Sequence, residues 1–286
     1  MFIESSIGTI GMINNWQQRI VSLAHNALYA ELACYPKAGL VSLIDSGSHH
    51  DMDKDTFLAS IAALDDYWLQ MIMLGENNAP FSELVAAGKA AENAMLRATN
   101  NVNTHRGAIF ILGVLVAACA ASYVKQAKFA MIPDLIRNLW GASILQHQTD
   151  RTSHGQQVRD RYLSNKCDII QHAAGGFEDI FNQYLPVLKK FYPRHSEVAY
   201  VQLFYILLSQ VQDTNLLYRG GLLGLEFAQD QALKFINAGG ITQRDWLSGA
   251  QSIHREFVKR NLSPGGCADL LAATVFVYHA EVELWG

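Results

Sequence analysis

Apolar residues recur at three- and four-residue intervals along most of the chain, which is the spacing of one face of an α-helix. Strict alternation of apolar and polar residues, the pattern of a half-buried strand, is hard to find, and only six prolines interrupt the chain. The pattern therefore predicts an all-α protein. The helical stretches are expected at Trp16–Ala33, Thr56–Leu74, Phe81–Ala98, Ile132–Leu145, Phe177–Phe191, Val198–Val211, Leu216–Ile236, Trp246–Lys259 and Ala268–Trp285.

Punctuation between these stretches supports helices within one domain. Pro80 and Pro133 lie near predicted helix starts, while Gly75 and Gly239-Gly240 follow predicted ends. The chain shows no internal repeat of solenoid length and no linker rich in Ser and Pro. We expect residues 1–286 to form a single compact multi-helix domain.

The most apolar segment, Gly107 to Val124, contains no charged residue, and its length reaches the lower limit for crossing a bilayer. It is rich in small residues, directly follows a polar run, and has no second such segment beside it in the sequence. A helix that is apolar on every side belongs in the core of a large helical protein. We therefore predict a buried central helix and no membrane span.

Composition narrows the class of function. Half of the residues are apolar, 17% are charged, and the formal net charge is -4, which indicates a packed globular protein and argues against a non-specific nucleic-acid binder. The four cysteines are far apart and form no C-x-x-C pair, as expected in a reducing compartment. Because the N-terminus shows no secretory signal pattern, we expect a cytoplasmic protein.

A long irregular stretch, Cys34–Asp55, separates two predicted helices, and a loop of this length inside a domain is usually functional or disordered. It contains Asp51 and Asp53 beside His49 and His50. Hard cations take oxygen ligands and leave positions for phosphates, so this pattern predicts a Mg²⁺-nucleotide site. The alternative for Asp53 is to cap the helix that follows.

The run Asn103-Thr104-His105-Arg106 opens the apolar helix. Free backbone N–H groups and the helix dipole favour an anion at such a start, so we expect His105 and Arg106 to face a phosphate. In the alternative, Asn103 or Thr104 caps the helix and Arg106 lies at the surface. Lys37, in the long loop, is a further candidate phosphate contact, although an isolated loop lysine is commonly just solvated.

A third cluster, Asp213-Thr214-Asn215 followed by Arg219, comes directly after an almost entirely apolar run. Asn215 and Arg219 are four residues apart and so share one face of a helix. Buried polar groups need partners, and a charged substrate is one candidate. The alternative role for Asp213 is a helix cap.

The segment Ser263-Pro264-Gly265-Gly266 has the composition of a helix start stripped of side-chain bulk, with Ser263 as the N-cap and Pro264 as the first residue. Each glycine in a first turn costs roughly 1 kcal/mol relative to alanine. We therefore expect a phosphate to approach the amides of Gly265 and Gly266. A capped helix without a ligand would explain Ser263 and Pro264 alone.

Together these clusters resemble the motifs of the triphosphoribosyl-dephospho-CoA synthases. The resemblance covers about Ala27 to Val277 and rests on the segments 36–41, 46–53, 103–110, 213–221 and 262–271 in that order. The Ser-Gly-Ser-His-His-Asp-Met-Asp run at 46–53 and the Asn-Thr-His-Arg run at 103–106 are more similar to the enzymes that serve malonate decarboxylase than to those that serve citrate lyase.

The resemblance implies an all-helical transferase with two nucleotide substrates. In the family's reaction, ATP loses adenine, and its triphosphoribosyl group is linked to the ribose 2′-hydroxyl of 3′-dephospho-CoA. The product is the precursor of a prosthetic group that a separate transferase attaches to an acyl carrier protein. An α-linkage formed from a β-nucleotide implies inversion in one displacement, which requires a carboxylate base near the acceptor.

The chain departs from the family pattern in three places. Ala38 stands where a second proline is common, and Cys267 replaces a usual serine. The stretch Gln171–Glu178 lacks the acidic residue and the Gly-Phe-Pro that relatives tend to show, so no role is assigned to it.

Matching this chemistry to the clusters predicts three sets of site residues. The catalytic set, a carboxylate base and an imidazole that assists the leaving adenine, is Asp269 or Asp213 with His50 or His105. The Mg²⁺ set is Asp51 and Asp53, with Asp213 as a further option. The triphosphate set is Lys37, Arg106, Asn215, Arg219, Ser263, Gly265 and Gly266.

Two other functions remain compatible with these residues. His50 and Asp51, with His25 upstream, mimic the paired ligands of helical metal-dependent phosphohydrolases, provided that the pair lies within a helix. If the His and Asp clusters are only helix caps, the chain is a non-catalytic helical binding protein. The sequence does not fix the oligomeric state, and a homodimer is one option.

Overall fold

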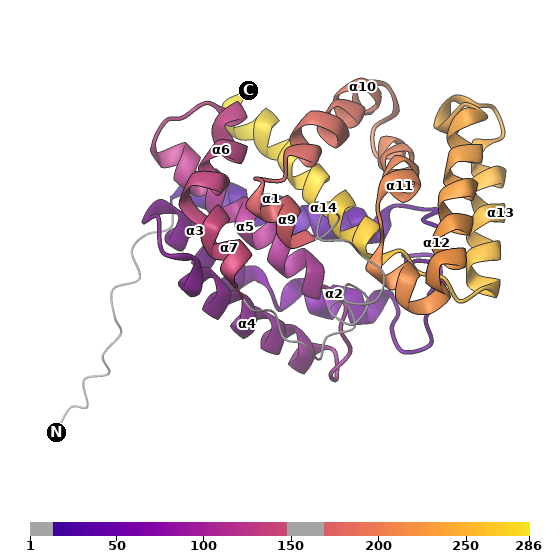
Figure 1. The fold of residues 1–286 in the computed structure, drawn as a ribbon, viewed down its shortest axis with the longest axis horizontal. Helices are drawn as coiled ribbons and strands as arrows, with labels where there is room; N and C mark the ends of the chain where they lie inside the picture. Colours follow the sequence, from indigo (N-terminus) through magenta and orange to yellow (C-terminus); the bar gives the residue numbers. More distant parts are fainter. Residues whose placement is uncertain (1–13, 148–168) are drawn as a thin grey trace.

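The computed structural model describes residues 14–147 and 169–286 (Figure 1). All regular secondary structure in these residues is helical, which confirms the predicted all-α class. The first half contains α1 (Asn15–Ala33), α2 (Lys54–Ala62), α3 (Asp65–Glu76), α4 (Phe81–Ala98), α5 (Arg106–Val124), η1 (Phe129–Met131), α6 (Ile132–Ile136), η2 (Arg137–Gly141) and α7 (Ala142–Gln146). The second contains α9 (Ile169–Ala174), η3 (Ile180–Tyr184), α10 (Leu185–His195), α11 (Val198–Gln210), α12 (Thr214–Asn237), η4 (Gly240–Thr242), α13 (Trp246–Lys259), α14 (Gly265–Ala280) and η5 (Glu281–Trp285).

Helix α5 is the predicted buried helix, and the structure confirms that prediction. Its residues from Ile111 to Ser122 are all buried, and it packs against α3, α4, α14 and α1. Among the described residues it is the one single helix long and apolar enough to cross a membrane, yet 78% of its most apolar window is buried inside the protein. The bent pair α2–α3 passes the same length and composition test only if it is counted as one span.

Several helices break where the apolar spacing predicts continuity. The predicted helix Thr56–Leu74 is two helices, α2 and α3, separated at Ala63 and Leu64. Helix α12 begins at Thr214 and is interrupted at Gly221, whose φ of 62° and ψ of -161° are not helical. Such a backbone conformation is accessible to glycine without steric cost. A break of this kind leaves the spacing of apolar residues almost unchanged, so the spacing does not reveal it.

The arrangement of the helices brings distant motifs to one end of the molecule. Helices α12 and α13 pack together at that end, and α14 runs from there past α5 and α1 toward the C-terminus (Figure 1). The starts of α12 and α14 therefore lie close to the long loop between α1 and α2 and to the start of α5. These four segments carry the motifs that the sequence singles out.

Candidate functional site

One buried carboxylate joins the starts of two helices. Asp213 precedes α12 and is 1% exposed. Its Oδ1 accepts hydrogen bonds from the backbone N–H groups of Asn215 (2.8 Å) and Leu216 (3.0 Å), and its Oδ2 accepts one from Cys267 of α14 (2.9 Å). Burial raises the pKa of Asp213, while these N–H groups favour its charged form and act in the opposite direction. The alternative capping role of Asp213 is confirmed, and Asp213 serves two helices rather than one.

The first turn of α14 is shaped around the same acid. The prediction that Ser263 is the N-cap is wrong, because the N-cap is Pro264, and the side chain that accepts from the first turn of α14 is that of Asp213. The Ser263 hydroxyl instead contacts His49. A Cβ atom on Gly266 would lie 3.1 Å from Oδ2 of Asp213, and one on Gly265 would lie 2.3 Å from Nδ2 of Asn215. The close approach that these glycines permit is therefore, in this structure, the approach of protein side chains.

A second acid occupies the start of the apolar helix. Asp269 of α14 accepts a hydrogen bond from the backbone N–H of Ala108, in the first turn of α5. A Cβ atom on Gly107 would lie 2.0 Å from Oδ2 of Asp269, so the glycine is what lets the carboxyl reach the helix. Burial raises the pKa of Asp269 well above its usual value, and the charges of Glu31 and Asp213 raise it further. Asp269 as a whole residue is half-buried, whereas Asp213 is buried.

The long loop packs against the rest of the protein, and Lys37, near its start, is buried beneath it. The Lys37 side chain is fully buried, and its Nζ donates hydrogen bonds to the carboxylate and to the backbone carbonyl of Glu31, at the end of α1. The alternative of a solvated lysine is therefore wrong. Because a charge left unpaired in a protein interior costs several kcal/mol, Lys37 is held to Glu31 in this structure and does not face solvent.

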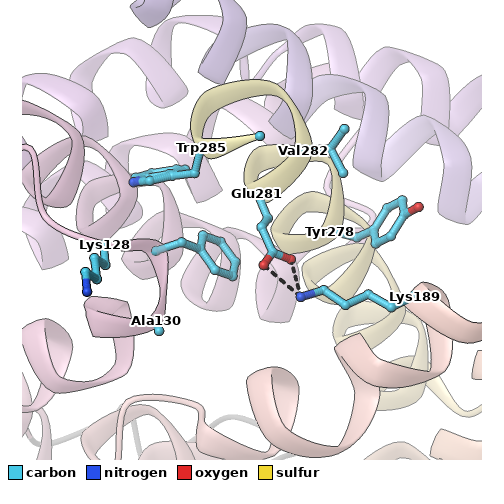
Figure 2. Close-up of a pocket in the computed structure, with 9 residues that line it drawn as sticks. Lys128, Ala130, Lys189, Tyr278, Glu281, Val282 and Trp285 are labelled. Carbon is cyan, nitrogen blue, oxygen red and sulfur yellow. Dashed lines mark hydrogen bonds and ion pairs between the residues drawn. The ribbon is translucent and has the colours of Figure 1, made fainter.

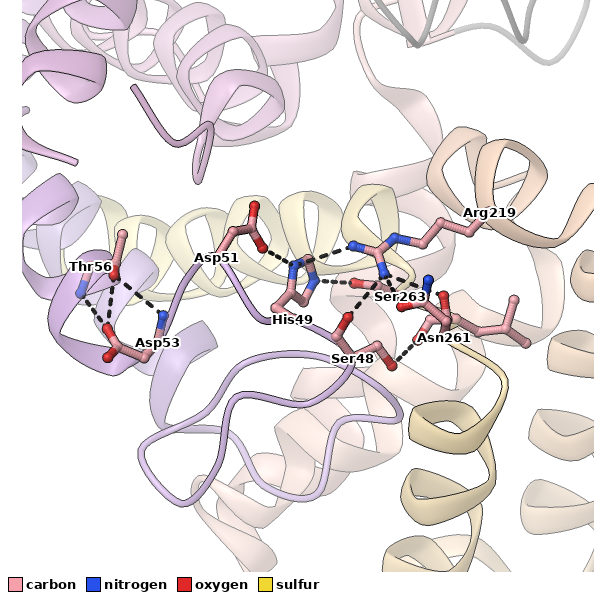
Figure 3. A network of polar contacts seen from close by, with 9 residues as sticks. Ser48, His49, Asp51, Asp53, Thr56, Arg219, Asn261 and Ser263 are labelled. Carbon is pink, nitrogen blue, oxygen red and sulfur yellow. Dashed lines mark hydrogen bonds and ion pairs between the residues drawn. The ribbon is translucent and has the colours of Figure 1, made fainter. Parts of the chain in front are cut away.

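The second half of the loop is tied to α12 and to the segment before α14 (Figure 3). Arg219 donates from Nη1 to the carbonyl of Ser48 (3.1 Å) and to Oδ1 of Asn261 (2.9 Å). His49 lies between Arg219 and Ser263, with Nδ1 3.3 Å from Nη2 of Arg219 and Nε2 2.8 Å from Oγ of Ser263. Burial and then the charge of Arg219 lower the pKa of His49.

The two predicted metal ligands are in different situations. Asp53 is the N-cap of α2, where its Oδ1 accepts from N (3.0 Å) and Oγ1 (2.8 Å) of Thr56, so its alternative capping role is confirmed. The Asp51 side chain is 62% exposed, with Oδ1 3.5 Å from Nδ1 of His49. Within residues 14–147 and 169–286, no three His, Cys, Asp or Glu side chains gather to hold a metal ion.

The position of the loop also bears on the phosphohydrolase alternative. That function needs His50 and Asp51 within a helix, but both lie in the irregular segment before α2. His50 is exposed to solvent there.

The polar run before α5 is divided between the interior and the surface. His105 is 3% exposed, and its Nδ1 lies 2.6 Å from Oγ of Ser60. Burial, reinforced by the charge of Lys37, lowers the pKa of His105 to about 3, so the imidazole is neutral at physiological pH. Arg106 is exposed and forms an ion pair with Glu92, and its backbone N–H donates to Oδ1 of Asn103 (3.2 Å). The N-cap of α5 is His105, but Asn103 satisfies the first N–H group of the helix and Arg106 lies at the surface, as the alternative expects.

Sequence reasoning missed two buried polar residues that hold the long loop. Glu31 is 4% exposed and lies on the buried face of α1, in register with Ala24, Ala27 and Leu28. His254 of α13 contacts the carbonyl of Lys37 (2.9 Å) through Nδ1 and Asp45 (3.2 Å) through Nε2. A signal for both residues was present in the sequence: Glu31 and His254 each occupy a position where the helical spacing of their helix predicts an apolar residue.

A cavity lies at the opposite end of α14 (Figure 2). It has a volume of about 640 Å³ and is lined by residues that include Phe129, Tyr278 and Trp285, with an ion pair between Lys189 and Glu281 at 2.7 Å. Because a helix rises 1.5 Å per residue, the length of α14 places this cavity about 20 Å from Gly265. None of the predicted site residues lines it.

Comparison with known proteins assigns a family. Residues 17–286 match the family described as ATP:dephospho-CoA triphosphoribosyl transferase. A protein of Acinetobacter calcoaceticus named "Probable 2-(5''-triphosphoribosyl)-3'-dephosphocoenzyme-A synthase" is 34% identical over 276 residues, 95% of this chain and 94% of the relative. The 2-(5''-triphosphoribosyl)-3'-dephosphocoenzyme-A synthase of Klebsiella pneumoniae is 34% identical over 275 residues, 91% of this chain and 90% of that protein.

A solved structure supports the fold independently. A crystal structure from Archaeoglobus fulgidus, whose name places it among the triphosphoribosyl-dephospho-CoA synthases, superimposes with a TM-score of 0.51 and 20% sequence identity. The match covers 78% of this chain and 98% of that chain. At this identity the match shows a shared fold and nothing about the site.

The geometry around Asp213 predicts that its removal destabilises the protein. In Asp213→Asn, the amide oxygen can still cap α12, but the amide nitrogen meets the N–H of Cys267, donor against donor. We expect a loss of about 1–3 kcal/mol in the free energy of unfolding, measured with urea.

The matched control is Asp269→Asn. Burial raises the pKa of both acids, so the pH dependence of their contributions has the same sign. Asp269 accepts a backbone hydrogen bond from Ala108, which the amide oxygen of asparagine can accept as well, so at a given pH this variant should lose less stability than Asp213→Asn. Equal stability of the two variants would contradict the bridging role.

Proposed function

The chain belongs to the ATP:dephospho-CoA triphosphoribosyl transferase family, and from that premise we propose that it transfers the triphosphoribosyl group of ATP to the 2′-hydroxyl of 3′-dephospho-CoA, with release of adenine. One observation carries the proposal. Two acids, Asp213 and Asp269, lie near each other where the starts of α5, α12 and α14 come together, beside the loop that contains Asp51.

We propose that Asp269 is the base. The bond between C1 of the ATP ribose and N9 of adenine breaks, and a bond from the acceptor 2′-oxygen to the same carbon forms. The hydroxyl proton passes to the carboxylate, and adenine leaves with the electrons of the broken bond, taking a proton from a neighbouring acid or from water. Asp269 suits the task because its raised pKa makes it more basic than an ordinary carboxylate. Asp213, which already accepts three backbone hydrogen bonds, is better suited to position α14.

We propose that the triphosphate lies at the start of α14, against Asn215, Arg219, Ser263 and the amides of Gly265 and Gly266. Asn215 is exposed beside Gly265, and the N-terminal end of a helix favours an anion. The other two residues of the triphosphate set would first have to leave carboxylate partners: Lys37 is paired with Glu31, and Arg106 with Glu92. Since His105 is buried and neutral, the exposed His50 is the better candidate to assist adenine.

We propose that Mg²⁺ accompanies ATP and is held by Asp51. Mg²⁺ is commonly bound by one or two carboxylates together with substrate phosphates, so it does not need a protein-only cluster. The exposed carboxylate of Asp51 fits that requirement. Asp53 fits it less well because one of its oxygens caps α2. Bound there, Mg²⁺ would neutralise charge on the triphosphate.

We propose further that the chain acts as one cytoplasmic domain and that its product passes to a separate transferase for the acyl carrier protein of malonate decarboxylase. The support for this carrier, rather than that of citrate lyase, is the resemblance of the runs at 46–53 and 103–106.

The central experiment is incubation with ATP and 3′-dephospho-CoA, followed by mass spectrometry. We expect free adenine and a triphosphoribosyl adduct of dephospho-CoA, and no adduct with CoA, whose 3′-phosphate adds charge and bulk beside the attacking oxygen. Asp269→Asn, which should fold, is expected to lower adenine release by at least about 100-fold. Release of inorganic phosphate without adenine would instead indicate a phosphohydrolase, and release of neither would indicate a binding protein.

The metal proposal predicts that EDTA stops turnover and that added Mg²⁺ restores it. Asp51→Asn should abolish turnover at Mg²⁺ concentrations that saturate the unaltered enzyme, with unchanged helical circular dichroism. Asp53→Asn is the matched control, because asparagine caps a helix as well as aspartate does. Turnover that persists in EDTA, or an active Asp51→Asn enzyme, would remove the metal from this loop.

The carrier assignment predicts which protein lacks its prosthetic group when the gene is deleted. The acyl carrier protein of malonate decarboxylase, isolated from the deletion strain, should have the mass of the unmodified polypeptide. A fully modified carrier in that strain would assign this enzyme to another system, such as citrate lyase.

A further inference from the structure

Three large apolar side chains of α12 are exposed to solvent beside the candidate site. Leu223 is 80% exposed, Leu222 is 53% exposed and Tyr218 is 51% exposed. Single exposed apolar residues are ordinary, but a contiguous group on a folded surface commonly marks a binding site. Gly221 lies inside the group, and its non-helical backbone turns the helix at this point.

Two glycines of the same helix, Gly220 and Gly224, pack against Leu262. A Cβ atom on Gly220 would lie 2.7 Å from Cδ2 of Leu262, and one on Gly224 would lie 3.1 Å from it. The face with these glycines therefore packs directly on the segment that leads into α14. Arg219 adds hydrogen bonds to Ser48 and Asn261 (Figure 3). The exposed leucines are thus carried on a turn that is anchored to the candidate site.

The first turns of α12 connect the candidate site to these leucines along the chain. Asn215 is exposed next to Gly265, at the start of α14. Asn215 and Tyr218 are three residues apart and so share one face of α12. From Asn215 to Gly220 the helix rises about 8 Å, and Leu222 and Leu223 follow directly after the break at Gly221. Between Asn215 and Leu223, Arg219 is the only charged residue, and its guanidinium is turned toward Ser48 and Asn261.

The geometry points to the pantetheine arm of the acceptor as the occupant of this surface. The inference rests on the proposed function, which places the reacting ribose of 3′-dephospho-CoA near Asp269. The acceptor carries its charged groups at the nucleotide end and a long, uncharged arm at the other. Once the nucleotide end is bound, the arm must run outward over the protein. Tyr218, Leu222 and Leu223 lie beside Asn215 and Arg219 of the candidate site, and they match the arm in their lack of charge.

The test compares two variants of exposed leucines on α12. Leu222→Ser/Leu223→Ser alters the surface, and Leu233→Ser, at a residue 48% exposed further along the helix, is the control. We expect the double variant to raise KM for dephospho-CoA about tenfold, with KM for ATP and the melting temperature unchanged. The control should behave as the unaltered enzyme. Inhibition by 4′-phosphopantetheine, competitive with dephospho-CoA, should be lost in the double variant alone.

The outcomes separate this inference from the proposed function. An active enzyme whose double variant keeps its KM for dephospho-CoA and its inhibition by 4′-phosphopantetheine overturns the placement of the arm. If sedimentation also shows that the double variant breaks a dimer while its KM stays unchanged, the surface is a contact between two copies of the chain. An unaltered enzyme that forms no adduct overturns the proposed function itself.

Discussion

A single buried carboxylate organises the end of the molecule where the motifs meet. Asp213 accepts hydrogen bonds from α12 with one oxygen and from α14 with the other. The first N–H groups of a helix have no partner within it, so one acid that satisfies two helix starts fixes their relative position. The position of Asp269 follows from this, because it lies in the second turn of α14. The arrangement of the candidate site therefore depends on the side chain of Asp213, which need not contact the substrate.

Buried charge is costly, and this protein keeps several charges close together. Lys37 is paired with Glu31, while Asp269 lies in the fields of Glu31 and Asp213. Replacing such groups by apolar residues is often neutral or stabilising, so a stable fold alone does not account for them. An acid whose pKa is raised by burial and by neighbouring acids is suited to accept a proton. This is the physical basis for placing the chemistry at Asp269.

The glycines show how close packing and chemistry are linked. A run of glycines at a helix start suggests an open approach for a phosphate. In the structure, the space beside Gly266 is taken by Asp213, and the space beside Gly107 is taken by Asp269. Both glycines let a carboxyl reach backbone amides. A triphosphate bound at this end would therefore lie near two carboxylates. The Mg²⁺ proposed at Asp51 would reduce the repulsion between the triphosphate and these carboxylates.

The sequence by itself determined the all-α class and the buried helix α5, and it singled out the segments that meet at the candidate site, because helical periodicity and capping residues are local properties. It also offered the capping roles of Asp53, Asn103 and Asp213 as alternatives, since a cap acts within a few residues. Only the tertiary structure decided that Asp213 reaches Cys267 and that Lys37 is buried against Glu31. The first contact joins helix starts that are 54 residues apart in the chain. Lys37 and Glu31 are six residues apart, but their burial depends on the elements that pack over them, which the spacing within α1 does not specify.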